Sequence, residues 1–251
     1  MHAQAGHIKI GFVHMRKASA VQDSSCYTMS VWVVIPAFNE ERVIASTVGS
    51  VRGAFSQIVV VDDGSSDATA AKSLDAGAYV CRHPINLGQG AALQTGIDFA
   101  LRQGAELIVT FDADAQHDVR DAENMVKFIQ STNVDVVLGS RFLGNAVAIG
   151  ARRRLFLRAA TLFTRLVTRM KITDTHNGLR CLKRSAAQRI RIRQNRMAHA
   201  SEILAQIGSL GISYAEYPCT ITYTDYSKAK GQRMSGAVAI LADLFFGKLH
   251  R

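Results

Sequence analysis

Residues 107–114 read LIVTFDAD, five apolar or β-branched residues followed by two aspartates with one alanine between them. A short run of this kind is typical of a strand that is buried on both faces of a sheet. Two carboxylates at the end of such a strand repel each other, and burial further disfavours their ionisation. A divalent cation, Mg²⁺ or Mn²⁺, would resolve that conflict, and Gln116 is placed to add a carbonyl oxygen as a ligand.

Taken alone, Asp112 and Asp114 have a simpler explanation, because aspartate is a common residue at the start of a helix. The surrounding sequence favours the metal interpretation. Apolar strands alternate with helical segments along residues 31–139, which predicts an α/β fold with a mostly parallel sheet flanked by helices. The expected strands are 31–35, ended by Pro36, and 57–61, 78–82, 107–111 and 134–138; the expected helices are 40–52, 67–76, 89–103 and 120–131.

Polar residues follow four of these strands, at the edge of the sheet where ligands collect in folds of this type. They are Asn39 and Glu40, Asp62 and Asp63, Asp112 and Asp114, and Ser140 and Arg141. Asp62 and Asp63 have two interpretations. A carboxylate at this position can accept hydrogen bonds from a base or ribose, or the segment can simply form a turn and a helix cap. Residues 86–90, NLGQG, would let backbone amides approach an anion at a helix start.

Several segments in the same order and spacing resemble glycosyltransferase family 2, and particularly its dolichol-phosphate mannosyltransferase and polyprenyl-phosphate glycosyltransferase branch. The segments are PAFNEE at 36–41, VDDGSSD at 61–67, NLG at 86–88, DADAQH at 112–117, GSRF at 139–142 and DTHNGLR at 174–180. The resemblance covers most of residues 31–230. It implies a GT-A-type fold, a nucleotide-sugar donor and an inverting displacement.

The resemblance also implies roles for individual residues. Asp112, Asp114 and Gln116 match metal-holding positions, and Asp114, Arg141 and Glu202 match the positions expected to act in catalysis. The nucleotide-sugar is expected to be surrounded by Pro36, Phe38, Glu40, Asp62, Asp63, Asn86, Gly88 and Asp112. The acceptor or its phosphate is expected to be bound by Arg180, Ser227 and Lys228.

Two acceptors remain open. A polyprenyl phosphate is already an anionic nucleophile and needs no base, whereas a sugar hydroxyl of a growing polysaccharide or glycolipid needs one, for which Glu202 is the candidate. Ser227 and Lys228 resemble the Ser-Lys pair of the lipid-phosphate branch. The arginine and glycine expected just before that pair are absent, because residues 222–226 read TYTDY.

The basic charge lies in one segment. The chain carries a formal net charge of +10, and residues 150–200 hold fourteen basic residues against the single acid Asp174. At about 100° per residue, Arg154, Arg158, Arg165 and Arg169 fall on one side of a helix over 153–170, which predicts contact with an anionic membrane surface or, alternatively, an ordinary surface helix. Nucleic acid is disfavoured because the acidic strand ends would repel it. An inactive scaffold is disfavoured by retention of both aspartates.

The expected organisation has three parts. Residues 1–28 form an irregular extension before Met29, which is the suspected biological start, residues 29–230 form the GT-A domain with a helical C-terminal elaboration, and residues 231–251 form a helix that is membrane-interfacial or part of the core. No run of about 20 apolar residues occurs, and the four cysteines lack metal-ligand spacing. A cytoplasmic protein, peripheral at the membrane, is therefore expected.

Overall fold

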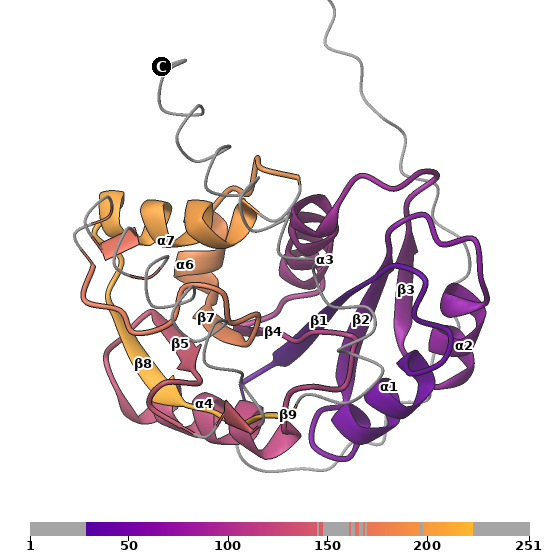
Figure 1. The fold of residues 1–251 in the computed structure, drawn as a ribbon, viewed down its shortest axis with the longest axis horizontal. Coiled ribbons are helices and arrows are strands. Elements are labelled where there is room, and N and C mark those ends of the chain that lie inside the picture. The colour runs from indigo at the N-terminus through magenta and orange to yellow at the C-terminus, as the bar shows by residue number, and fades with distance from the viewer. Residues whose placement is uncertain are drawn as a thin grey trace, which may run out of the picture.

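The computed structural model describes residues 29–144, 146–147, 161, 164–165, 168, 170–195 and 198–222. Their centre is a sheet of seven strands in the order β3-β2-β1-β4-β7-β5-β8 (Figure 1). Six strands run in one direction, and β7 runs antiparallel to both of its neighbours. The strands are β1 Val31–Ala37, β2 Gln57–Asp62, β3 Tyr79–Arg82, β4 Leu107–Thr110, β5 Val136–Ser140, β7 Arg180–Lys183 and β8 Tyr214–Pro218. A separate parallel pair joins β6 Ala146–Val147 to β9 Ile221–Thr222.

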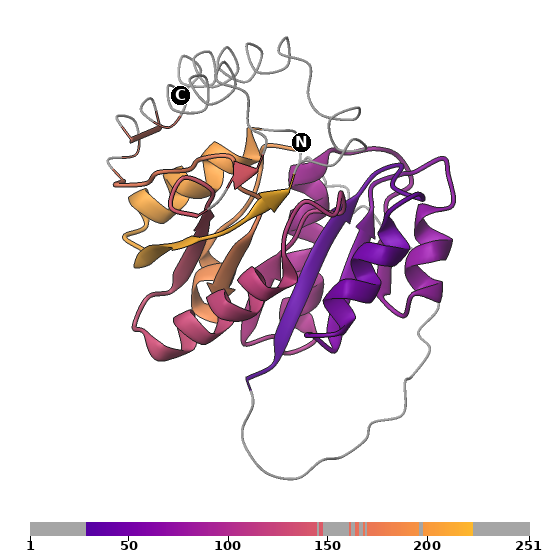
Figure 2. The same cartoon turned by 60° about the horizontal axis from the view of Figure 1, so that its bottom comes forward.

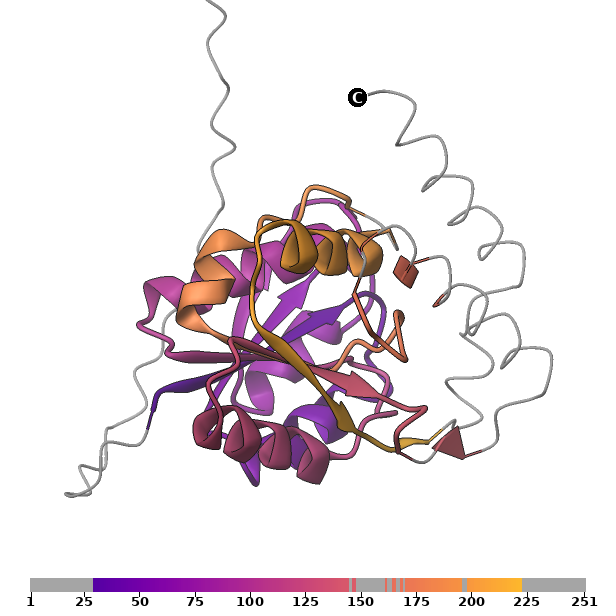
Figure 3. The same cartoon turned by 90° about the vertical axis from the view of Figure 1, so that its left-hand side faces the viewer.

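Helices cover both faces of this sheet. The helices are α1 Ile44–Arg52, α2 Thr69–Asp75, α3 Gln89–Arg102, α4 Val119–Ser131, α6 Arg184–Arg189 and α7 His199–Ser209. Figures 1 and 3 show α3, α6 and α7 on one face and α1 and α4 on the other. Figure 2 shows α2 and β8 at opposite ends of the sheet. The mostly parallel α/β architecture expected from the sequence is confirmed.

Side-chain alternation along β1 explains why both faces are covered. Trp32 and Val34 belong to the core beneath α3, α6 and α7, while Val33 and Ile35 belong to the core beneath α1 and α4. Each of these side chains is at least 97% buried. Burial of a valine or isoleucine side chain stabilises the folded state by about 1.5–3 kcal/mol. The side chains of this one strand therefore stabilise the packing of both helix layers on the sheet.

The prediction that Pro36 ends the first strand is wrong, because β1 continues to Ala37 and pairs with β2 from Trp32 to Ala37. Pairing with β4 stops at Val34, whose carbonyl accepts from the N–H of Phe111. The carbonyl of Ala37 points the other way, toward the N–H of Asp63. Backbone groups alternate sides along a strand, so the missing N–H of Pro36 faces the side on which β4 has already ended.

Strand β7 was not predicted from the sequence. It lies between β4 and β5 and brings the segment 174–180 beside the carboxyl end of β4. Residues 214–223, a strand-like run in the sequence, form two separate strands, β8 and β9. The N–H of Cys219, between them, donates to the carbonyl of Ser140.

Several predicted features lie outside the described residues: the extension 1–28, the segment 231–251, and most of the helix expected over 153–170. Of the four arginines on that helix only Arg165 is described, and its Nε donates to the carbonyl of Ile172. Within the described part of the chain, no helix is both long enough and apolar enough to cross a membrane.

Candidate active site

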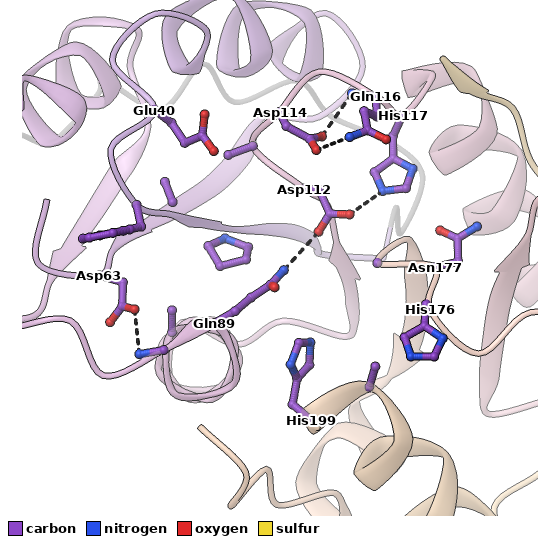
Figure 4. A pocket seen from close by; sticks show the side chains of 18 of the residues that line it. Glu40, Asp63, Gln89, Asp112, Asp114, Gln116, His117, His176, Asn177 and His199 are labelled. Atoms are coloured by element: carbon purple, nitrogen blue, oxygen red, sulfur yellow. Dashed lines mark hydrogen bonds and ion pairs between the residues drawn. The ribbon is translucent and has the colours of Figure 1, made fainter. Parts of the chain in front are cut away.

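A pocket of about 630 Å³ opens at the carboxyl ends of the parallel strands (Figure 4). Its volume falls in the range of small-molecule sites. Residues from all four predicted strand ends meet in it, and residues from the segment 174–180 and from the start of α7 complete the wall. The lining comprises Pro36, Ala37, Phe38, Glu40, Asp63, Asn86, Gly88, Gln89, Ala92, Asp112, Ala113, Asp114, Gln116, His117, Arg141, His176, Asn177, Gly178, Arg180, His199, Ala200 and Ile221.

Asp112 follows β4, and its carboxylate is held by two neighbours. Oδ2 lies 2.9 Å from Nε2 of His117, and Oδ1 accepts from the side-chain amide of Gln89 at 3.4 Å. His117 is itself buried, with its ring edge against Phe111. Burial raises the pKa of Asp112, but the hydrogen bond and charge of His117, aided by Arg180 and His199, outweigh it and hold that pKa below its usual range.

Asp114 has the opposite electrostatic environment. Burial and the nearby charge of Asp112 raise the pKa of Asp114 to about 6. The backbone N–H of Gln116 donates to its Oδ1 at 3.2 Å, and the side-chain amide of Gln116 donates to Oδ2. The intervening Ala115 has a φ of 58°, a left-handed conformation that is uncommon for a residue with a Cβ and that turns the chain tightly between the two side chains.

The donor set at Asp112 and Asp114 fits a hard divalent cation. Burial and the charge of Asp112 both disfavour the charged form of Asp114, whose pKa is raised. No three His, Cys, Asp or Glu side chains among the described residues form a ready-made metal site. A cation held by two carboxylates, with the side chain of Gln116 alongside and ligand oxygens completing the shell, is the arrangement that Mg²⁺ commonly adopts.

Asp62 and Asp63, at the end of β2, lie in different environments. Asp63 lines the pocket, with Oδ1 accepting from the N–H of Leu87 at 2.9 Å and lying 2.7 Å from Nδ1 of His83, and with Oδ2 accepting from the N–H of Gly88 at 2.7 Å. Asp62 does not line the pocket. It is fully buried, accepts from the N–H of Ser65, and forms an ion pair with Arg82 at 3.1 Å.

Gly90, the second residue of α3, packs against the backbone of a loop. A Cβ at Gly90 would lie 2.0 Å from the carbonyl oxygen of Gln194, and the N–H of Gly90 donates to the carbonyl of Asn195 at 2.8 Å. The N–H groups of Leu87 and Gly88 donate to Asp63. Three of the amides expected to meet an anion at this helix start, those of Leu87, Gly88 and Gly90, therefore already have protein acceptors.

Arg141 is fixed at the pocket wall by the segment that precedes β7. Its Nε donates to Oδ2 of Asp174 at 2.6 Å, and one terminal nitrogen donates to the carbonyl of His176 at 2.8 Å. Both members of this ion pair are buried, with side-chain exposures of 7% and 1%. A charge-assisted hydrogen bond to the carboxylate, together with a second bond from the same guanidinium to a backbone carbonyl, orients this side chain firmly.

Glu202 is not brought to the pocket. Its Oε2 accepts from the N–H groups of Arg193 at 2.9 Å and Gln194 at 2.8 Å, so the carboxylate holds the loop that packs on Gly90. Ser227 and Lys228 lie outside the described residues.

Five polar lining residues had no role assigned from sequence: Gln89, His117, His176, Asn177 and His199. Four of them stand inside quoted segments, Gln89 in NLGQG, His117 in DADAQH, and His176 and Asn177 in DTHNGLR, so their presence there was the available signal. His199 carries no such signal, because only the docking of α7 brings it to the pocket.

The sequence profile of the family described as Glycosyl transferase family 2 matches residues 32–191, more than half of the chain. A UDP-N-acetylglucosamine–dolichyl-phosphate N-acetylglucosaminyltransferase of Methanococcus voltae is 29% identical over 223 residues, covering 80% of this chain and 89% of that protein. The polyprenol monophosphomannose synthase of Mycolicibacterium smegmatis is 29% identical over 223 residues, covering 84% of this chain and 83% of that protein.

The fold is similar to that of glucosyl-3-phosphoglycerate synthase from Mycobacterium tuberculosis, solved in complex with Mn²⁺, uridine-diphosphate-glucose and phosphoglyceric acid. The TM-score is 0.69 at 16% identity, over 86% of this chain and 77% of that chain. The likeness confirms the GT-A-type fold that the sequence motifs imply.

Proposed function

The chain belongs to glycosyl transferase family 2, and we propose that it transfers a sugar from a nucleotide diphosphate-sugar to a polyprenyl phosphate, with inversion at the anomeric carbon. The observation that carries this proposal is the single pocket into which Asp63, Asp112, Asp114 and Arg141 converge. The two relatives above bear names of enzymes that act on dolichyl phosphate and polyprenol, which supports the acceptor class.

The nucleotide is assigned to the part of the pocket near β1 and β2. Phe38 lines it with 40% of its surface exposed and offers an apolar surface to a base. Asp63 accepts hydrogen bonds from protein groups on both oxygens, yet a carboxylate has about four acceptor positions, so one remains for a base or ribose. Pro36, Glu40, Asn86 and Gly88 line the same pocket and are assigned to the donor with them.

Asp112 and Asp114, with Gln116, are the residues that would hold Mg²⁺ or Mn²⁺. The metal, when bound, neutralises charge on the departing diphosphate. We assign Arg141 to stabilise the negative charge that develops on the departing diphosphate. Its ion pair with Asp174 keeps the guanidinium oriented at the pocket wall before any ligand binds. Preorganisation of this kind avoids a reorganisation cost during the reaction.

A phosphate acceptor is supported by the position of Glu202. Attack by a lipid phosphate on the anomeric carbon needs no proton acceptor, whereas a sugar hydroxyl does. The candidate base, Glu202, is hydrogen-bonded to the loop at 193–194 and does not line the pocket. A lipid acceptor also places the enzyme at a membrane, and the basic segment 150–200 suits the anionic cytoplasmic surface.

The test is a panel of radiolabelled nucleotide sugars incubated with the protein and a membrane lipid extract. Transfer into an acid-labile, phosphate-bearing lipid is expected, with loss of transfer in EDTA and in Asp114→Ala. Label that appears only in polysaccharide would refute the acceptor class, and undiminished turnover by Asp114→Ala would refute the metal assignment.

A further inference from the structure

His83 is a buried side chain that lies behind the pocket wall and contacts Asp63. It directly follows β3, is 5% exposed, and does not line the pocket. Its Nδ1 lies 2.7 Å from Oδ1 of Asp63, which is itself only 3% exposed. Because a carboxylate oxygen only accepts, Nδ1 carries the hydrogen in this contact.

The ring of His83 is held in place from the side opposite Asp63. Its Nε2 lies 3.0 Å from the hydroxyl oxygen of Thr95 on α3. The backbone N–H of His83 donates to the carbonyl of Asp62 at 2.9 Å. A partner at the second ring nitrogen fixes both the tautomer and the orientation of an imidazole. The N–H that His83 gives to Asp63 is therefore set before any ligand binds.

The protein donors around Asp63 leave its two oxygens unequal. A carboxylate has about four acceptor positions, two on each oxygen. Oδ1 receives both the N–H of Leu87 at 2.9 Å and Nδ1 of His83, so its positions are filled. Oδ2 receives only the N–H of Gly88 at 2.7 Å within the described part of the chain. One acceptor position remains, and it belongs to Oδ2.

This remaining position is assigned to the base of the nucleotide. The diphosphate is expected at Asp112 and Asp114, and the base is the end of a nucleotide most distant from its diphosphate. Figure 4 shows Asp63 at the left of the pocket, apart from Asp112 and Asp114. The exposed ring of Phe38 lines the same pocket and offers a surface on which a base can stack.

We infer that His83 is a positioning residue that makes Asp63 select uracil over guanine. Guanine presents an N–H and an amino group side by side, and a carboxylate matches them only with one free position on each oxygen. Uracil presents a single N–H, which one free position on Oδ2 matches. By occupying Oδ1, His83 removes the second position that guanine needs. This inference rests on the proposed function and specifies the donor as a uridine diphosphate-sugar.

The test measures nucleotide affinity by titration calorimetry in the presence of Mn²⁺ and without any acceptor. We expect the wild-type protein to bind UDP with a Kd at least tenfold below that of GDP. His83→Leu, which removes the donor to Oδ1, should raise the Kd of UDP at least fivefold and reduce the preference for UDP to less than threefold. The preference is the informative quantity, because a general structural defect would weaken both nucleotides equally.

A conservative variant separates the hydrogen bond from the shape of the ring. The side-chain amide of His83→Asn places an N–H near the position of Nδ1, so this variant should keep the preference for UDP within threefold of the wild type. If His83→Leu does not fold, Thr95→Val takes its place. Thr95 does not line the pocket, and loss of its hydroxyl frees the imidazole ring, so the preference should fall at least twofold.

The outcomes distinguish this inference from the proposed function. Equal affinity for UDP and GDP in the wild type, or a preference for GDP, overturns the selection of uracil. An unchanged preference in His83→Leu, an equal loss for both nucleotides, or the same loss in His83→Asn overturns the role of His83. Failure to glycosylate any prenyl phosphate overturns the proposed acceptor and leaves the base preference standing, because the binding measurements contain no acceptor.

Discussion

The backbone of Gly178 lies directly against the carboxylate of Asp112. A Cβ at position 178 would stand 2.2 Å from Oδ2 and 2.4 Å from Oδ1, distances that real Cβ atoms do not reach. The hydroxyl of Thr110 donates to the carbonyl of Gly178 at 2.6 Å and fixes the backbone there. The carboxylate therefore has its position only because residue 178 has no side chain.

Gly178→Ala should displace Asp112 and weaken metal binding. We expect the affinity for Mn²⁺ in the presence of a nucleoside diphosphate, measured by titration calorimetry, to fall at least tenfold, with a larger fall in transfer. Gly49→Ala is the matched control, because nothing lies within 4 Å of its Cβ position and it stands inside α1. That control should leave activity unchanged and stabilise the protein by about 0.5–1 kcal/mol. Equal metal affinity in wild type and Gly178→Ala would contradict the contact.

Asp114→Asn should stabilise the metal-free protein at neutral pH. The pKa of Asp114 is raised to about 6, so ionising it costs folding free energy, and that cost grows as the pH rises from about 4 to 6. In EDTA at pH 7 we expect the variant to be more stable by about 1–2 kcal/mol by denaturant unfolding. The difference should vanish below about pH 3, where the wild-type carboxyl is protonated in both states, and a gap that instead widened at low pH would refute the raised pKa.

His117 should act through Asp112. Removing a hydrogen-bonding neighbour of a metal ligand typically costs 10- to 100-fold in metal affinity or activity. We expect His117→Ala to show a loss of about that size in Mn²⁺ affinity, measured by calorimetry, because Asp112 loses its 2.9 Å contact. His83→Ala provides a comparison, since His83 contacts Asp63 rather than Asp112. If both variants bound Mn²⁺ like the wild type, the positioning role would be excluded.

Glu202→Gln should change kcat less than threefold. The carboxylate accepts two backbone hydrogen bonds, and a side-chain amide oxygen can accept them as well. Glu202→Ala should lower the free energy of unfolding by about 1–2 kcal/mol, because the two N–H groups lose their acceptor. A large fall in kcat for Glu202→Gln, with unfolding unchanged, would instead restore a base and a hydroxyl acceptor. The comparison needs steady-state rates and denaturant curves on the same preparations.

The parallel part of the sheet was predictable because its strands are continuous apolar runs. β2 and β3 were expected at 57–61 and 78–82 and occur at Gln57–Asp62 and Tyr79–Arg82. β7 was not predicted because it has only four residues and both its first and its last residue, Arg180 and Lys183, are charged. Its pairing partners, β4 and β5, lie far away in sequence, and local patterns do not encode such pairing.

The same limits apply to the site. Asp62 and Asp63 are equivalent in sequence, but successive strand residues point to opposite sides, so only Asp63 faces the pocket. Strand-end position was sufficient to find Asp112, Asp114 and Arg141. It was not sufficient for His199, which reaches the pocket through the docking of a helix.

The antiparallel strand β7 also imposes an order of folding. Until Arg180–Lys183 has been synthesised and inserted, β4 lacks the neighbour on one of its edges, and β5 lacks both of its neighbours because β8 follows β7 in the chain. A nascent or truncated chain that ends before this strand exposes these edges, which are sites of aggregation. The carboxylates of β4 are present early, whereas Gly178 and Arg180 arrive with β7. Gly178, whose backbone packs against the carboxylate of Asp112, therefore reaches that side chain only in the step that inserts β7 into the sheet.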